Sequence, residues 1–422
     1  MADFVQKMTA EPVFNPTPRP DRWFVGWLSL AQLISWGSVF YTFALLMEPL
    51  ERELGLSRAQ SSLAFSLALL AEGVLAYPVG RWIDRGLERR VMTGGSLLVA
   101  ACLALHSTVH SVAGFYAVWI GLGAAMSATL YTPAFSVVTR RHPHDFRRAI
   151  ITLTFLGGLA STVFIPLSAW LIAAVGWRAT LLWLAALHLV VCVPLHAVLL
   201  RHAPGAAHHA EASPQARAER AARLRPLLRS PPFLLVGVFV VLMMAINAAL
   251  PPHMISLLRE AGMGAAWVVA IPASIGVLQV LGRALLYFFE HRFDVHRANR
   301  LIPCLIPLGL AALLAAPWLA SVAPGSAVGA ALLFVALYGM GNGMITIVKG
   351  TAIAQYVDRD HVASLNGALG LPSALARALA PWMMGVLWQP QTGYALGLWL
   401  LVAAGVMAVG ALWLAQRHRA QV

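Results

Sequence analysis

The chain alternates long apolar runs with short polar connectors from residue 23 almost to its end. Each run is close to the roughly 20 residues that a helix needs to cross a bilayer core of about 30 Å. Alternation over about 10 residues, which marks a membrane β-barrel, is absent. The pattern therefore predicts an all-α integral membrane fold of twelve transmembrane helices. We place them at residues 24–47, 59–80, 91–109, 112–139, 149–175, 179–200, 233–257, 264–289, 301–319, 326–349, 361–388 and 391–415.

Composition agrees with lipid as the surrounding solvent. Hydrophobic residues make up 59% of the 422 residues and charged residues 11%, whereas a soluble domain is about 25% charged. The net charge of +13 comes from basic residues in the connectors, where membrane topology accounts for them, so we expect no nucleic-acid partner. Cys102, Cys192 and Cys304 fall in separate runs without a nearby ligand set. We therefore expect no disulfide, metal or cofactor.

A polar segment divides the apolar runs into two groups of six. Residues 201–232, rich in arginine, histidine and proline, are expected to link an N-terminal bundle (23–200) to a C-terminal bundle (233–416), with short tails at 1–22 and 417–422. Most lysines and arginines outside the spans fall on the side of the N-terminus, which places the linker and both termini in the cytoplasm. We expect a multi-pass protein of the bacterial inner membrane that functions as a monomer.

The two halves resemble each other weakly. One constant shift aligns Met47 with Met254, Glu72 with Gln279 and Arg85 with Arg292. Such a pattern indicates a duplicated six-helix unit, an arrangement in which a transporter holds its solute near the midplane between the halves.

The connector between the second and third spans carries a recognisable motif. It reads Gly80-Arg81-Trp82-Ile83-Asp84-Arg85-Gly86-Leu87-Glu88-Arg89-Arg90. The motif resembles the signature loop of the major facilitator superfamily, which is a glycine, three residues, Asp-Arg, another glycine and basic residues. Here the second glycine comes one residue early and Glu88 is an addition. The resemblance covers about residues 24–415 and implies two six-helix bundles that rock about a central site to give alternating access.

The same resemblance suggests a role for the loop. We expect Asp84 to pair with Arg85, Arg89 or a helix N-terminus across the cytoplasmic face, as a conformational latch that begins at Gly80. The alternative is a solvated basic loop that only sets topology. Aspartate adds little to membrane orientation, which favours the latch.

Few charged residues fall inside the predicted spans, where a charge costs at least about 3 kcal/mol on insertion scales. Glu72 lies about 12 Å from Gly80 by helix rise. The cations are Arg283 in the eighth span, Arg377 in the eleventh and Lys349 near the inner end of the tenth. Cations in the eighth and eleventh spans resemble the oxalate/formate antiporter and monocarboxylate porter branch, where they bind substrate carboxylates. The guanidinium fork matches a carboxylate in two contacts, so we expect these cations to bind an anionic substrate.

Each charged residue also has a competing interpretation. Arg283 or Arg377 would instead pair permanently with Glu72 or with backbone carbonyls, and Lys349 would reach to the membrane interface. Glu72 either takes up and releases a proton, because burial favours its neutral form, or serves as a fixed counter-ion.

Polar residues on other spans are expected to complete the binding site. These are Gln32, Tyr41, Tyr131, Asn247, Gln279, Asn342 and Asn366. The alternative for each is a hydrogen bond between helices. Two glycine clusters, residues 121–123 and 339–343, predict closely packed helices.

Together these features predict a secondary transporter that moves a small organic anion, a carboxylate in the leading interpretation, by proton symport or anion exchange. The alternative is a proton-coupled exporter of drugs or other toxic solutes. A phosphate-binding P-loop motif is absent, which argues against ATP hydrolysis. One intramembrane glutamate and scattered histidines do not gather an acid, a base and a nucleophile at one depth, so we expect no enzyme.

Overall fold

The structure, a computed structural model, describes residues 22–142, 146–201, 223–289, 294–323, 325–359 and 361–419. Over these residues the chain is helical apart from short connections, with one isolated bridge between Gln389 and Gly393. The predicted all-α fold is confirmed.

The helices of the first half are α2 (Arg22–Ser35), η1 (Trp36–Tyr41), α3 (Phe43–Leu54), α4 (Arg58–Trp82), η2 (Ile83–Leu87), α5 (Glu88–His106), α6 (Val112–Thr129), α7 (Tyr131–Arg141), α8 (Phe146–Gly158), α9 (Ala160–Leu187), η3 (His188–Cys192) and α10 (Val193–Leu199). Those of the second half are α12 (Pro231–Glu260), α13 (Ala265–Phe289), α14 (Val295–Leu301), η5 (Ile302–Cys304), α15 (Leu305–Val322), α16 (Ser326–Tyr356), α17 (Val362–Val386) and α18 (Ala395–Arg419). The segments η1, η2 and η3 are π-helical, whereas η5 is a 3-10 turn.

Most predicted spans agree with these helices to within a few residues at their ends. Nine stretches of the described chain are long and apolar enough to cross a membrane. Two of them, Arg58–His106 and Arg148–Leu199, each run through two predicted spans, and α17, which is not among the nine, provides a further one. The turn between the fifth and sixth predicted spans is Gly176, whose φ of 81° breaks the helical path inside α9. Glycine adopts this left-handed conformation without steric cost.

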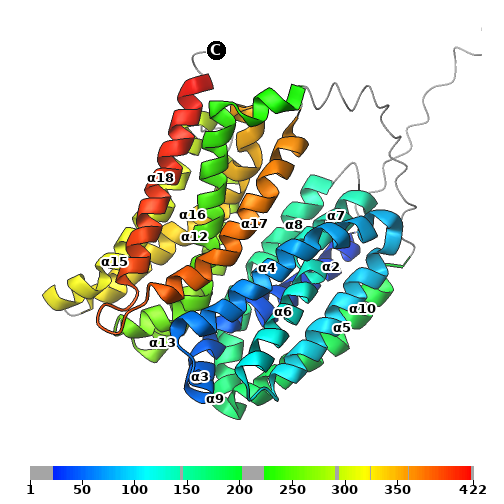
Figure 1. The fold of residues 1–422 in the computed structure, drawn as a ribbon, viewed down its shortest axis with the longest axis vertical. Coiled ribbons are helices and arrows are strands. Elements are labelled where there is room, and N and C mark those ends of the chain that lie inside the picture. The colour runs from blue at the N-terminus through cyan, green and yellow to red at the C-terminus, as the bar shows by residue number, and fades with distance from the viewer. Residues whose placement is uncertain are drawn as a thin grey trace, which may run out of the picture.

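The helices form two groups, each with a hydrophobic core of its own. Figure 1 shows α2 to α10, in blue to teal, on one side and α12 to α18, in green to red, on the other. In the first group the rings of Phe43, Phe65 and Trp119 pack with centroids 4.6 to 5.9 Å apart. In the second, Phe334 stacks on Tyr338 at 5.2 Å. We call these groups the N-terminal and C-terminal bundles.

The long helices run between two ends of the molecule. The linker face contains Arg85, Arg201 and Arg223, and the far face contains Ser57 and Glu260. The predicted tails 1–22 and 417–422 and the linker 201–232 lie wholly or partly outside the described residues. Their boundaries, and the cytoplasmic location of the linker face, stay predictions.

The two bundles pack most closely toward the far face. Where α17 crosses α4, a Cβ on Gly385 would stand 2.1 Å from Ser62 Oγ and 2.7 Å from the carbonyl oxygen of Arg58. Where α13 meets the start of α9, a Cβ on Gly276 would stand 2.7 Å from the carbonyl oxygen of Gly158. Toward the linker face, where the C-terminus lies, the two bundles diverge (Figure 1). This arrangement closes the far face.

Candidate functional site

A cavity of about 310 Å³ lies between the two bundles. The N-terminal bundle contributes residues from η1, α4, α7, α8 and α9, and the C-terminal bundle contributes residues from α12, α13, α16 and α17. Most of its polar lining residues were predicted from the sequence: Tyr41, Glu72, Tyr131, Asn247, Gln279, Arg283, Asn342 and Arg377. The structure therefore brings eight of the predicted site residues, from both halves, to one cavity.

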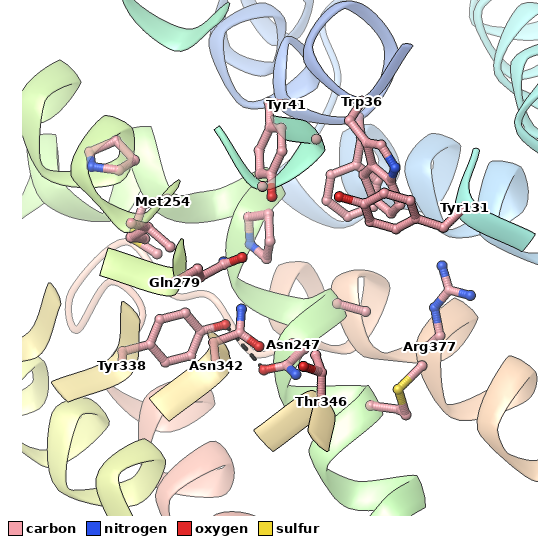
Figure 2. Close-up of a pocket in the computed structure, with 18 of the residues that line it drawn as sticks. Trp36, Tyr41, Tyr131, Asn247, Met254, Gln279, Tyr338, Asn342, Thr346 and Arg377 are labelled. Carbon is pink, nitrogen blue, oxygen red and sulfur yellow. Dashed lines mark hydrogen bonds between the residues drawn. The ribbon is translucent and has the colours of Figure 1, made fainter. Parts of the chain in front are cut away.

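The wall formed by the N-terminal bundle is aromatic. Trp36, Phe40 and Tyr41 come from η1, where the π-helical path places neighbouring residues on the same side of the first span. π-helical segments are frequent at functional sites. Tyr131 opens α7 after Leu130, whose extended backbone ends α6, and its ring lies 4.9 Å from that of Trp36. Figure 2 shows Trp36, Tyr41 and Tyr131 facing the cavity from this wall.

The opposite wall carries amides and two hydroxyl groups. Asn247, Gln279 and Asn342 come from α12, α13 and α16, and Thr346 lies one turn beyond Asn342 on α16 (Figure 2). The hydroxyl of Tyr338 is 3.5 Å from Oδ1 of Asn247. These groups offer both donors and acceptors to a solute.

Close packing behind this wall fixes the position of Gln279. A Cβ on Gly343 would stand 2.1 Å from the carbonyl oxygen of Gln279, and a Cβ on Gly339 would stand 2.7 Å from Cβ of Leu278. The contact of α13 with α16 therefore requires glycine at both positions. Gly123 has the same role against the carbonyl oxygen of Ala68 on α4, also at 2.1 Å. The predicted packing role of the two glycine clusters is confirmed.

Glu72 and Arg377 form an ion pair across the two bundles. Nη2 of Arg377, on α17, donates to Oε2 of Glu72, on α4, over 3.0 Å. Both side chains are largely buried, with relative exposures of 24% for Arg377 and 9% for Glu72. This is the pairing that the sequence left as an alternative to substrate binding, and it neutralises Arg377 in this conformation.

Arg283 is held differently from Arg377. Its Nη1 donates to the carbonyl oxygen of Thr154 on α8 over 2.8 Å, and its Nε approaches the carbonyl oxygen of Gly343 at 3.4 Å. Among the described residues, no carboxylate lies within ion-pairing distance of this half-buried guanidinium. These contacts are the pairing with backbone carbonyls that the sequence left as an alternative for Arg283, and they supply dipoles to two of its nitrogen atoms but no opposite charge.

Three predicted site residues do not line the cavity. Gln32 is fully buried and donates through Nε2 to the carbonyl oxygen of Thr129 over 2.6 Å, as an interhelical hydrogen bond. Nζ of Lys349 lies 2.9 Å from Sδ of Met244, behind the cavity wall. Asn366 lies on an exposed face of α17, nearer the linker face than Arg377. Of these three residues, only Gln32 forms the interhelical hydrogen bond that was its alternative, and Lys349 stays buried beside Met244 and does not reach the membrane interface.

The cavity also contains residues that sequence reasoning missed. Trp36, Phe40, Met254, Tyr338 and Thr346 all contribute to its lining. Aromatic residues and methionine are expected at lipid-facing, core and cavity positions alike. Their residue types therefore could not indicate from the sequence that they line the cavity. The π-helical turn that directs Trp36 inward has no sequence signature of its own.

The predicted latch lies at the linker face. Gly80 is the third-last residue of α4, while Asp84 and Arg85 are exposed on η2. No hydrogen bond or ion pair joins Asp84 to another described residue in this open conformation. Arg89 donates through Nε to the carbonyl oxygen of Ala197 over 2.7 Å. The latch stays a prediction about the conformation in which the linker face closes.

The chain belongs to the major facilitator superfamily, because the model of that family matches residues 28–381. The uncharacterized MFS-type transporter YcxA of Bacillus subtilis (strain 168) is 25% identical over 194 residues, which cover 45% of this chain and 46% of that relative. The match thus spans about half the length of this curated relative. The protein is a multi-pass membrane transporter that works by alternating access, and such transporters are not enzymes.

Solved transporter structures share the fold over nearly the whole chain. A D-xylose-proton symporter superposes with a TM-score of 0.74 at 14% identity, covering 92% of this chain and 96% of its own. A mutant of the nucleoside transporter NupG gives 0.71 at 17% identity, covering 93% and 99%. At such identities the likeness establishes the fold and leaves the solute open.

Proposed function

We propose that the protein transports a small organic monoanion, a carboxylate with an apolar or aromatic body. The observation that carries this proposal is Arg283, a cavity-lining cation held by carbonyl oxygens with no ion-paired carboxylate among the described residues. Charge at membrane depth is costly, by at least about 3 kcal/mol on insertion scales. A bound anion would offset that cost.

The charge balance of the cavity favours one negative charge on the solute. Its charged lining residues are Glu72, Arg283 and Arg377, which together carry one formal positive charge in excess. A monocarboxylate neutralises this excess, whereas a dicarboxylate would leave one negative charge without a partner among the lining residues. The guanidinium of Arg283 matches the two carboxylate oxygens geometrically.

The two walls indicate what the rest of the solute looks like. The aromatic wall of Trp36, Phe40, Tyr41 and Tyr131 offers apolar surface and ring faces for stacking. The amides of Asn247, Gln279 and Asn342 offer hydrogen bonds on the other side. Together they support a compact acid with an apolar side and one hydrogen-bonding group, within the cavity volume of about 310 Å³.

Glu72 is the proposed coupling residue. It already binds Arg377 across the bundles, so protonation of Glu72 would break an ion pair between them and release a second cation. Proton symport requires such a link between protonation and bundle packing. Anion exchange would instead leave the pair intact and let a second anion reset the transporter.

The test is counterflow in liposomes that contain the purified chain, with a panel of labelled mono- and dicarboxylates. We expect monocarboxylate counterflow, and a fall of about 100-fold in Arg283→Gln because a charge-assisted contact of about 3 kcal/mol is lost. Arg297→Gln, an exposed arginine on α14, serves as the matched control and is expected to keep normal transport.

Equal counterflow by Arg283→Gln and the unchanged protein would refute the anion proposal. Loss of protection against toxic cations or neutral compounds in a deletion strain, without any carboxylate counterflow, would support the exporter alternative instead.

A further inference from the structure

A second hollow lies on the outer side of the N-terminal bundle, at the linker face. It has a volume of about 800 Å³ and lies between η2 with the start of α5 on one side and α10 on the other. Figure 1 shows α5 and α10 together on the side of this bundle that faces away from the C-terminal bundle. None of the residues that line this hollow lines the transport cavity.

Three arginines surround this hollow: Arg89, Arg90 and Arg201. All three are exposed, and Arg89 uses only its Nε, toward the carbonyl oxygen of Ala197. None forms an ion pair with a carboxylate among the described residues. The nearest carboxylate in sequence, Glu88, is fully buried and is bound by Nε of Arg141 over 2.6 Å. The hollow therefore presents concentrated positive charge without an internal counter-ion.

The backbone leaves room at the start of α5. Gly86 turns the chain with a φ of 84°, and α5 follows η2 directly, with the buried Glu88 in its first turn. Gly94, on the lining one turn further, has open space where a Cβ would stand. A bulky head group thus meets no side chain at this point.

The surface below the arginines is apolar. Leu97 lines the hollow and is 46% exposed. Leu98 and Leu105 on α5, and Val190 and Val198 on η3 and α10, are also exposed. Apolar side chains exposed along membrane-spanning helices face acyl chains, so the hollow joins a basic rim to a lipid-facing groove.

We propose that this hollow binds an anionic phospholipid, with the phosphate at Arg89, Arg90 and Arg201 and an acyl chain along Leu97. Basic pockets between transmembrane helices at one membrane face have the chemistry that acidic lipid head groups require. Soluble phosphate meets the arginines equally well but gains nothing from the apolar groove. A lipid is therefore the occupant that uses both parts of the hollow.

The test is native mass spectrometry of the full-length chain in detergent, titrated with phosphatidylglycerol, cardiolipin, phosphatidylcholine or inorganic phosphate. We expect retained adducts of the anionic lipids, and a loss of affinity of about tenfold or more in Arg89→Gln/Arg90→Gln. The control, Arg148→Gln/Arg297→Gln, removes the same charge from exposed positions on α8 and α14 and is expected to bind normally. The Arg201→Gln variant is expected to weaken binding in the same direction.

Several results would overturn the proposal. These are equal binding of phosphatidylcholine, displacement of the lipid by millimolar inorganic phosphate, or the same loss in the control variant as in the pocket variant. Thermal unfolding of each variant in detergent without added lipid distinguishes a lost site from a misfolded chain.

Discussion

The interface between the bundles differs between its two ends. At the far face, Arg58 joins both bundles: it lies 3.2 Å from Glu51 and 3.4 Å from Glu260, donates to the hydroxyl of Tyr394 over 2.8 Å and stacks over Trp388. Among pairs in which both partners are described, the bundle-to-bundle hydrogen bond nearest the linker face is that of Arg283 with Thr154. By helix rise, Arg283 lies about 9 Å before the end of α13.

This difference shows that the chain adopts a conformation closed at the far face and open toward the linker face. The contacts at the far face must therefore change during the transport cycle. At the far face, ion pairs and close contacts at glycines join the two bundles, whereas at the linker face the bundles diverge. Alternating access requires these ties to break and an equivalent set to form at the other end. The predictions below remove contacts at one end and follow the distance between spin labels at Thr108 and Gln391, both exposed on the far face.

The largest effect is expected from Arg58→Gln. The side chains of Arg58 and Glu51 are only 10% and 12% exposed, and breaking a buried ion pair costs about 3 kcal/mol. We expect the spin-label distance to shift toward a far-open population. Arg52→Gln removes an arginine that is 76% exposed on the same face and is expected to change little. An unchanged distance in Arg58→Gln would show that its contacts do not hold the far face closed.

The next largest effect is expected from Gly385→Val. The new side chain would overlap Ser62 Oγ and the backbone of Arg58, which cannot move without separating α17 from α4. Overpacking of this kind costs about 2 kcal/mol, so the far-open population should rise. Gly370→Val, where a Cβ meets open space on the same helix, is the matched control. Equal behaviour of the two variants would contradict the steric account.

A smaller effect on the distance is expected from Glu72→Gln, together with a loss of proton coupling. The ion pair with Arg377 lies near the middle of the interface, and its loss should cost about 1 kcal/mol because Arg377 stays partly solvated. Uptake should no longer respond to an imposed proton gradient. Comparison with Arg377→Gln and the double variant isolates the coupling energy of the pair. Proton-driven uptake that persists in Glu72→Gln would exclude this residue as the coupling group.

The smallest effect on this conformation is expected from Asp84→Asn. Asp84 is exposed and unpaired with other described residues, so the spin-label distance should stay the same while transport falls several-fold at near-normal expression. Asp294→Asn, an exposed aspartate at the start of α14, should be nearly neutral, because Asp294 caps α14 through the amide of His296 and asparagine caps equally well. Normal transport by Asp84→Asn would remove the latch from the mechanism.

The sequence by itself determined the helices and the chemical types available to the site. The length of each apolar run located the spans, because a helix needs about 20 apolar residues to cross the bilayer core. Charged residues are rare inside the spans, and this singled out Glu72, Arg283 and Arg377. A charge at membrane depth costs free energy and is retained where it has a partner or a function. Clustered glycines predicted contacts that Gly343 and Gly123 in fact make.

Only the tertiary structure decided which of these residues meet. The sequence left open which arginine pairs with Glu72. In the structure Arg377 faces Glu72 across the bundles, while Arg283 meets only carbonyl oxygens. Lys349 and Gln32 turned away from the cavity in the same manner. In soluble helices a polar stripe reveals the outward face, but here both the lipid and the core are apolar. The rotation of each helix about its axis is therefore set by packing between helices, which no single run of residues encodes.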